Sequence, residues 1–160
     1  MLNRRFLFIA ATLAALAGCA TPSGPVSVAD TIAAQPQLST LNGLVAKTGL
    51  TDTLKGTGPF TVFAPTNEAF AKVPAKTMDE LAKDPAKLKA VLTYHVVPGK
   101  LMAADVKNGN SKTVNGAHVA LAKAGEFVTI EEALVQTADI SATNGVVHVV
   151  DSVLIPPATR

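Results

Sequence analysis

Hydrophobic residues recur with a helical period in the first half of the chain and with β-strand periods in the second half. Leu38, Leu41 and Val45 fall on one face of a predicted helix, and Gly49 is suited to the end of that helix. From Lys112 onward, short alternating or continuously apolar runs replace the helical spacing. Helices followed by strands, without an internal repeat, predict a domain of the α+β class.

Three further helices are predicted from signals at their N-termini. Thr66 is placed to cap a helix, because its hydroxyl can accept a hydrogen bond from a backbone N–H of the first turn. Thr77 and Glu80 lie three residues apart, which fits the reciprocal hydrogen bonds of a capping box. Asp84 followed by Pro85 combines an acidic cap with a proline at the first helical position. We therefore expect helices to begin at these three points.

The strand signals are clearest at three places. Residues 60–64 alternate and are rich in β-branched and aromatic side chains, which predicts a strand. Residues 113–114 and 117–121 flank the pair Asn115-Gly116, which is a strong signal for a two-residue hairpin. The nearly unbroken β-branched run over 146–154 is typical of a strand that is buried on both faces.

The N-terminal segment has the organisation of an export signal. Two arginines precede an apolar stretch over residues 6–16, which is too short to span a bilayer stably. The sequence Leu16-Ala17-Gly18-Cys19 then resembles the bacterial lipobox, in which the signal peptide is removed and the cysteine becomes the acylated first residue. We expect residues 1–18 to be a lipoprotein signal peptide, Cys19 to carry the lipid, for example palmitate, and residues 19–27 to be a flexible tether. A plain secretory signal and an ordinary buried thiol are the alternatives.

Lipid attachment predicts a location in the cell envelope, with the membrane as a partner through the anchor. Ala20 stands where an inner-membrane retention signal has Asp, which implies the outer membrane or a periplasm-facing position. Cys19 is the only cysteine, so its acylation leaves no thiol for a disulfide, a nucleophile or a cysteine metal site. Of the seven aromatic residues, two lie in the signal, and the core is therefore expected to be aliphatic.

Composition excludes some partners. Removal of residues 1–18 takes 160 residues to 142, which is enough for one domain with a single core. Two arginines leave with the signal, so Lys and Arg fall from 14 to 12 against 12 acidic residues, and the net charge is near zero. The absence of a basic tract predicts no nucleic-acid binding. A charge near zero favours self-association without fixing an oligomeric state.

Three segments together resemble the fasciclin (FAS1) domain, in matching order and separation. They are FTVFAPTNEAF at 60–70, YHVVPG at 94–99 and NGVVHVVDSVLIP at 144–156. The resemblance covers about residues 28–157, nearly the whole mature chain. It implies an α+β fasciclin-like fold, a twisted β-sandwich or wedge with helices packed along one side. It also implies a role in cell adhesion or in contacts with surface proteins or glycans.

The resemblance also indicates candidate partner-binding residues. Animal fasciclin domains have been proposed to engage integrins through an Asp-Ile pair and through the Tyr-His segment. The matching residues here are Asp139 and Ile140, and Tyr94 and His95. The residues themselves favour a structural role for Tyr94 and His95, which lie between an apolar helix and an apolar strand and should form internal hydrogen bonds. Asp139 is expected to cap a turn.

The histidines predict no metal site. His148 lies between two valines, so on a regular strand it points away from them, and we expect it to be a core histidine bonded to Asn67 or Asp151. His95, His118 and His148 lack the short spacings of a zinc site.

Enzyme signatures are missing as well. There is no nucleophile elbow, phosphate loop or dinucleotide fingerprint, and no cofactor is predicted. Glu131 and Glu132 are neighbours that would face opposite ways on a strand, so we interpret them as a solvated edge or turn. The primary hypothesis is a non-catalytic, envelope-anchored binding module. The alternatives are a periplasmic structural or stress-related protein and, less favoured, a small-molecule carrier or hydrolase with a pocket between helices and sheet.

Overall fold

The computed structural model describes residues 26–156. The predicted signal peptide, Cys19, the tether up to residue 25 and Pro157 lie outside the described residues. Within residues 26–156 no helix is both long enough and apolar enough to cross a membrane.

Short helices make up most of the first half of the domain and strands most of the second, as the α+β prediction requires. The helices are α1 (Val28–Ala34), the 3₁₀ turn η1 (Pro36–Leu38), α2 (Ser39–Lys47), α3 (Leu50–Lys55), α4 (Asn67–Lys72), α5 (Ala75–Lys83) and α6 (Pro85–Tyr94). The strands are β1 (Phe60–Pro65), β2 (Val96–Pro98), β3 (Gly109–Lys112), β4 (His118–Ala124), β5 (Phe127–Ile130), β6 (Ala133–Ala142) and β7 (Gly145–Val150).

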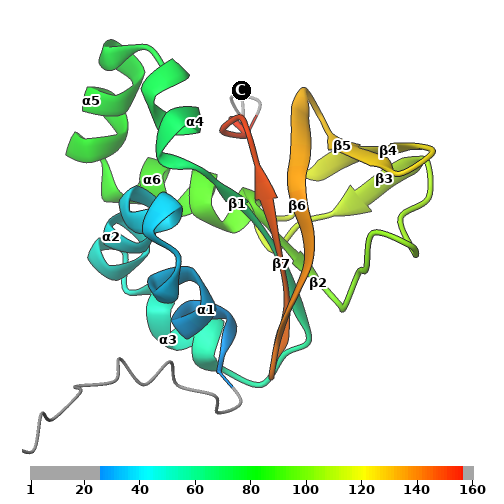
Figure 1. Ribbon diagram of the computed structural model, residues 1–160. Coiled ribbons are helices and arrows are strands. Elements are labelled where there is room, and N and C mark those ends of the chain that lie inside the picture. Colours follow the sequence, from blue (N-terminus) through cyan, green and yellow to red (C-terminus); the bar gives the residue numbers. More distant parts are fainter. Residues whose placement is uncertain (1–25, 157–160) are drawn as a thin grey trace, which may run out of the picture.

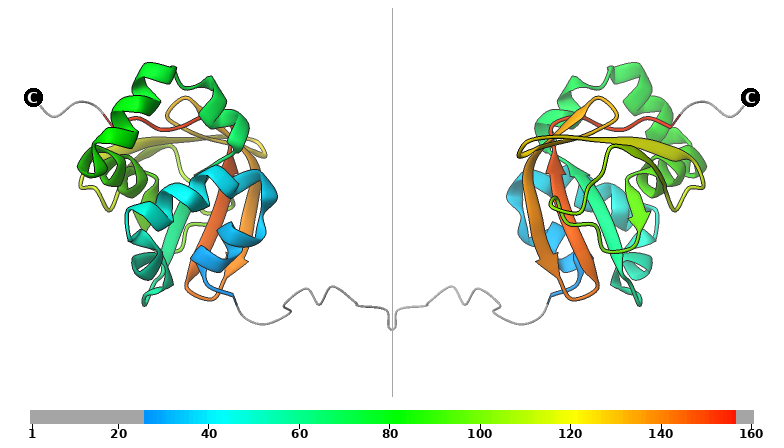
Figure 2. Two further views of the ribbon diagram at one scale, coloured as in Figure 1. Left: turned by 90° about the vertical axis from the view of Figure 1, so that its left-hand side faces the viewer. Right: turned by 90° about the vertical axis from the view of Figure 1, so that its right-hand side faces the viewer.

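The strands form one bent sheet in the order β2-β1-β7-β6-β5-β4-β3. Strands β1 and β7 pair in parallel, although they are the first and the last strands of the described chain, and the other pairs are antiparallel. Figure 1 shows the helices along one side, with β3, β4 and β5 projecting on the other. In Figure 2, the helices lie in front of the sheet in the left view and behind it in the right view. The predicted wedge with helices along one side is thus confirmed.

Strand alternation divides the interior into two clusters on opposite faces of the central strands. On β1, Val62 belongs to the cluster beneath the helices, whereas its neighbour Phe63 belongs to the cluster beneath β4 and β5. On β7, Val147 and Val149 face the helices and Val150 faces the other way. Every residue of β7 is buried, which confirms the prediction of a strand covered on both faces.

The helix starts were predicted correctly at two of three positions. The Thr66 hydroxyl accepts a hydrogen bond from Ala69 N–H (3.2 Å), and the Asp84 carboxylate caps the helix that begins at Pro85. The predicted capping box at Thr77 is wrong, because α5 begins two residues earlier, directly after Pro74. Pro74, the residue before the helix, has an extended ψ of 135° and makes no side-chain cap bond, so this helix begins without a side-chain cap.

The predicted hairpin around Asn115-Gly116 is wider than two residues. Strand β3 ends at Lys112 and β4 begins at His118, so residues 113–117 form the connection. Within that connection, Val114 N–H donates to Val96 O (2.8 Å) and Asn115 N–H donates to Thr93 O (3.3 Å). The connection therefore links the β3 edge of the sheet to β2 and α6, and the sheet is nearly closed on itself.

Candidate interaction site

Three side chains from the central strands fix the segment that follows β2; two of them are buried, and the third lies at an irregularity in β6. We call Thr61, Asp139 and His148 the clamp. Thr61 Oγ1 donates to Gly99 O (2.7 Å) and accepts from Leu101 N–H (2.8 Å). The clamp therefore orders an irregular segment, residues 99–106, against β1, β6 and β7.

His148 is the buried centre of the clamp, with an exposed fraction of 1%. Its ring stacks on Phe63 with ring centroids 5.4 Å apart, Nδ1 accepts from Asp139 N–H (3.2 Å), and Nε2 lies 2.7 Å from Leu101 O. These partners select the neutral ring with its proton on Nε2. Burial lowers the pKa of His148, and the bond to Leu101 O opposes that shift only in part.

This geometry corrects one expectation and confirms another. His148 is indeed a core histidine that points away from its valine neighbours, but its partners are not Asn67 or Asp151. Asn67 instead bonds to η1 and α2, and Asp151 accepts from Leu134 N–H (2.9 Å).

Asp139 and Ile140 lie at an irregularity in β6. The pairing of β6 with β7 shifts register between Thr137 and Ile140, and Asp139 adopts a positive φ of 59° there. Its carboxylate accepts from Ala103 N–H (2.7 Å), while the side chain as a whole is exposed. Ile140 is half-buried against the helix-side cluster. Asp139 is thus both an acceptor for the backbone of the segment after β2 and a charge that is accessible on the surface.

His95 is buried at the end of α6, with an exposed fraction of 2%. Nδ1 lies 2.8 Å from Val91 O and Nε2 accepts from Leu154 N–H (2.9 Å), so the ring ties α6 to the segment after β7. Burial lowers the pKa of His95 to about 4. The internal hydrogen bonds expected for this residue are confirmed.

Tyr94 is also buried, at 3% exposure, and its hydroxyl lies among polar groups. The hydroxyl donates to His118 O (3.1 Å) and lies 3.4 Å from a Glu131 oxygen, which also accepts from Ala120 N–H (2.8 Å). Burial raises the pKa of Tyr94, and the neighbouring carboxylate raises it further. Glu131 itself has a positive φ of 52° in the turn between β5 and β6, which confirms a turn at the glutamate pair.

The two predicted pairs therefore do not form one site. No hydrogen bond links Tyr94 or His95 to Asp139 or Ile140 among the described residues, and only Asp139 is exposed. The segment 26–156 contains no cluster of three or more His, Asp or Glu side chains arranged to hold a metal ion. Sequence reasoning missed the contacts of Thr61, Glu131 and Ala103, because these contacts join segments that are distant in the chain.

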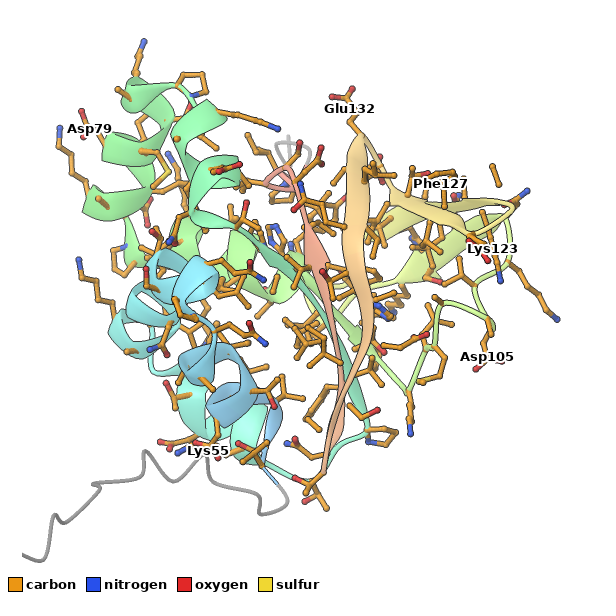
Figure 3. All side chains as sticks on the ribbon, in the orientation of Figure 1. Lys55, Asp79, Asp105, Lys123, Phe127 and Glu132 are labelled. Carbon is orange, nitrogen blue, oxygen red and sulfur yellow. The ribbon has the colours of Figure 1, made fainter. Side chains whose placement is uncertain are left out.

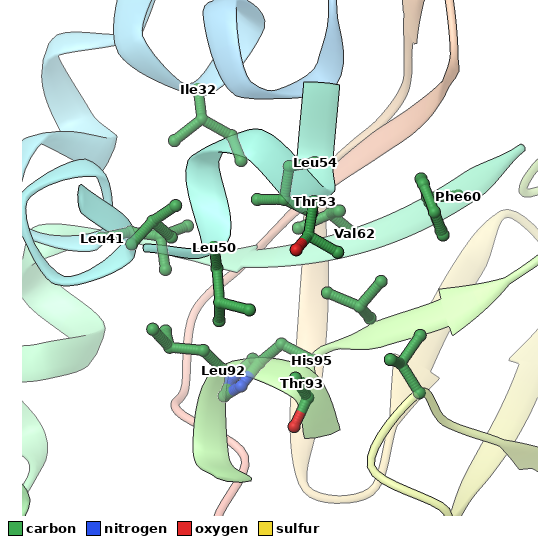
Figure 4. A pocket seen from close by; sticks show the side chains of 13 residues that line it. Ile32, Leu41, Leu50, Thr53, Leu54, Phe60, Val62, Leu92, Thr93 and His95 are labelled. Carbon is green, nitrogen blue, oxygen red and sulfur yellow. The ribbon is translucent and has the colours of Figure 1, made fainter. Parts of the chain in front are cut away.

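An apolar pocket lies between α2, α3, β1 and β2 (Figure 4). Leu41, Leu50, Leu54 and Leu92 point into it, and His95 lies at its edge. Its volume is about 30 Å³, far below the several hundred Å³ of a ligand site. This size counts against the carrier or hydrolase hypothesis for the space between helices and sheet.

Comparison with protein families and relatives gives a consistent result. The model of the fasciclin domain matches residues 36–156. The protein sll1483 of Synechocystis sp. is 40% identical over 140 residues, which cover 86% of this chain and 78% of that protein. The immunogenic protein MPB70 of Mycobacterium bovis is 40% identical over 152 residues, covering 87% of this chain and 78% of that protein.

Two further similarities concern location and fold. The cell surface glycolipoprotein MPB83 of Mycobacterium bovis is 37% identical over 159 residues, covering 88% of this chain and 71% of that protein. Among solved structures, a FAS1 domain pair from the insect cell adhesion molecule Fasciclin I superposes with a TM-score of 0.65 at 19% identity. That match covers 82% of this chain and 51% of the solved one, so this chain spans about half of the domain pair. At this identity the likeness shows the fold.

Proposed function

The chain belongs to the fasciclin domain family, and on that premise we propose that it is a lipid-anchored envelope protein that mediates adhesion or binds a surface protein or glycan. Membership makes it a non-catalytic protein of the surface or adhesion type. The lipid anchor and the binding partner are the parts that we propose. The protein would act through its exterior while the anchor holds it at high local concentration beside the membrane.

One observation carries this proposal. A lipobox-like sequence that ends in the only cysteine, Cys19, is followed after a short linker by a fasciclin domain over residues 36–156. The similarity to a cell surface glycolipoprotein of Mycobacterium bovis supports the same location. Neither buried histidine is accessible for chemistry, because each is nearly completely covered and bonded internally.

We place partner binding at the exposed part of the clamp, around Asp139 and Ile140. Asp139 is exposed and presents a charge beside residues 99–106, which the clamp holds rigidly. A rigid surface loses little conformational entropy when it binds. Tyr94 and His95 would then support the shape of the domain from within, since both are almost fully buried.

Protease treatment of intact cells tests the surface location. A surface-displayed domain should be released or degraded by added protease while a cytoplasmic marker survives. An inward-facing protein would stay intact until the envelope is opened, and this result would replace the proposed function with the periplasmic alternative.

Labelling with radioactive palmitate tests the anchor. The wild-type protein should incorporate label and sediment with membranes, whereas Cys19→Ser should incorporate none and remain uncleaved as the precursor. Equal labelling of both proteins would show that the lipid is not on Cys19.

Crosslinking on living cells tests the binding site. Asp139→Asn keeps an oxygen that can accept from Ala103 N–H but removes the charge, so the domain should stay folded while crosslinked partners decrease. Asp79→Asn is the matched control, because Asp79 is an exposed carboxylate on α5 (Figure 3). If both variants lost crosslinked partners to the same extent, or if neither variant lost any, the proposed binding site around Asp139 and Ile140 would be wrong.

A further inference from the structure

The chain enters the domain at the tip of the β6–β7 hairpin, and two residues of that tip hold it there. Thr143 donates from its backbone N–H (2.9 Å) and its hydroxyl (3.2 Å) to Val26 O. Asn144 Oδ1 accepts from Val28 N–H (2.8 Å), and its amide nitrogen donates to Leu54 O (2.6 Å). The position of Val26 is therefore fixed relative to α3 and to one end of the sheet (Figure 1).

The short distance along the chain from Cys19 to Val26 limits how far this end can lie from an anchor. Seven residues span at most about 25 Å when fully extended. A domain of this length is roughly 35 Å across, from its expected radius of gyration. Residues beside Val26 can therefore lie at a membrane that holds Cys19, and Glu132 lies at the end of the domain opposite Lys55 (Figure 3).

The surface around this entry point contains an open groove of about 700 Å³. We call its lining the entry surface; it consists of residues 55–59, Lys100 and residues 142–145. The lining includes two lysines and no carboxylate. Lys100 has no ion-pair partner among the residues that the structure covers.

Lys55 pairs with Asp30 (3.3 Å), but both side chains are about half exposed, at 48% each. An ion pair so exposed to water contributes little to stability, so Lys55 can exchange Asp30 for another anion at small cost. Lys47 and Asp52 are nearby in sequence and Asp30 is nearby in space, but none of the three lines the groove. The groove itself therefore presents positive charge among small neutral residues.

From these observations we infer that the entry surface faces the bilayer and that Lys55 and Lys100 contact the phosphates of lipid headgroups. The inference rests on the proposed anchor at Cys19, which supplies the proximity, and adds an orientation to it. Lysine side chains near an anionic lipid surface are attracted to it, and here the tether holds them within reach. The end that carries Glu132 then points away from the membrane.

Single-tryptophan variants test this orientation directly, because the natural chain has no tryptophan. Thr57→Trp places the probe on the entry surface, and Glu132→Trp is the matched control at the opposite end; both positions are exposed. The acylated proteins are reconstituted in vesicles of phosphatidylcholine and phosphatidylglycerol that contain headgroup spin-labelled lipid. Thr57→Trp should lose most of its fluorescence, and Glu132→Trp should keep nearly all of it.

Flotation of the same vesicles separates the two ways in which the inference can fail. Protein that floats without preferential quenching of Thr57→Trp would overturn the orientation and leave the anchor standing. Protein that does not float would overturn both the anchor and the inference.

A charge test examines the lysines. In the Thr57→Trp protein, changing both Lys55 and Lys100 to Gln should reduce quenching in the vesicles that contain phosphatidylglycerol. Changing both Lys76 and Lys83 on α5 to Gln should leave the quenching unchanged. Equal quenching in both double variants would show that the lysines make no headgroup contact.

Discussion

Acid should destabilise this domain mainly through His95. The ring is almost fully buried and neutral, and both of its nitrogens are occupied by Val91 O and Leu154 N–H. Protonation would place an uncompensated charge in the core and remove the acceptor for Leu154 N–H. The unfolded chain has no such restriction and should bind a proton near the ordinary histidine pKa of 6.5.

The size and the sign of this effect follow from the two pKa values. The folded pKa of about 4 lies below the unfolded 6.5, so the unfolded state binds more protons between them and stability rises with pH in that window. His95 therefore contributes its full stabilisation above pH 6.5 and loses it as the pH falls to about 4. At 1.36 kcal/mol for each pH unit, the loss is about 3 kcal/mol.

Urea unfolding followed by circular dichroism at several pH values between 7 and 4 measures this contribution. His95→Gln removes the titrating group and should be less stable than wild type near pH 7, by an amount on the order of 1–3 kcal/mol for imperfectly replaced buried hydrogen bonds. The difference between wild type and variant should then shrink as the pH falls, because only wild type loses the histidine contribution. The variant keeps the smaller acid sensitivity of His148, whose pKa is also lowered by burial. A difference that stays constant over this pH range would refute a buried neutral His95.

Further substitutions test the packing and the caps. Gly145→Ala should destabilise the domain severely or prevent folding, because an added Cβ would collide with Phe60 O. Gly43→Ala, at a position in α2 with open space around it, should instead stabilise the domain by about 0.5–1 kcal/mol. Equal melting temperatures of the two variants would contradict the close approach of β1 and β7. Thr66→Ala should lower the free energy of unfolding by about 0.5–2 kcal/mol through loss of the α4 cap, and no change in urea midpoint would show that the cap is unimportant. Asn144→Ala removes three hydrogen bonds of the entry point and should speed hydrogen exchange at Val28 N–H, and unchanged exchange there would argue against this attachment.

Local sequence signals predicted elements whose cause is local. Thr66 and Asp84 cap helices because a short polar side chain reaches the N–H groups of the adjacent first turn, which needs no distant partner. The capping-box signal at Thr77 failed because Pro74 allows the helix to begin earlier, and the threonine then lies inside it. The hairpin predicted at Asn115-Gly116 forms between β3 and β4, but its connection is longer than two residues, and Val114 and Asn115 within it donate to Val96 and Thr93.

The site shows the same division between local and distant causes. Strand alternation was sufficient to place His148 on the face opposite its valine neighbours. Its partners could not be predicted, because Leu101 is 47 residues away and meets it only when the irregular segment after β2 packs across β7. The same applies to Tyr94 and Glu131, which are 37 residues apart and meet only when the β4–β5 part of the sheet packs over the end of α6.

The mass of the N-terminal peptide of the native protein, purified from membranes, tests the central claim most directly. The mature chain should begin at Cys19 and carry acyl groups on that residue. A peptide that continues through Gly18, or one that contains Cys19 as a free thiol, would contradict the lipid-anchored surface protein proposed here.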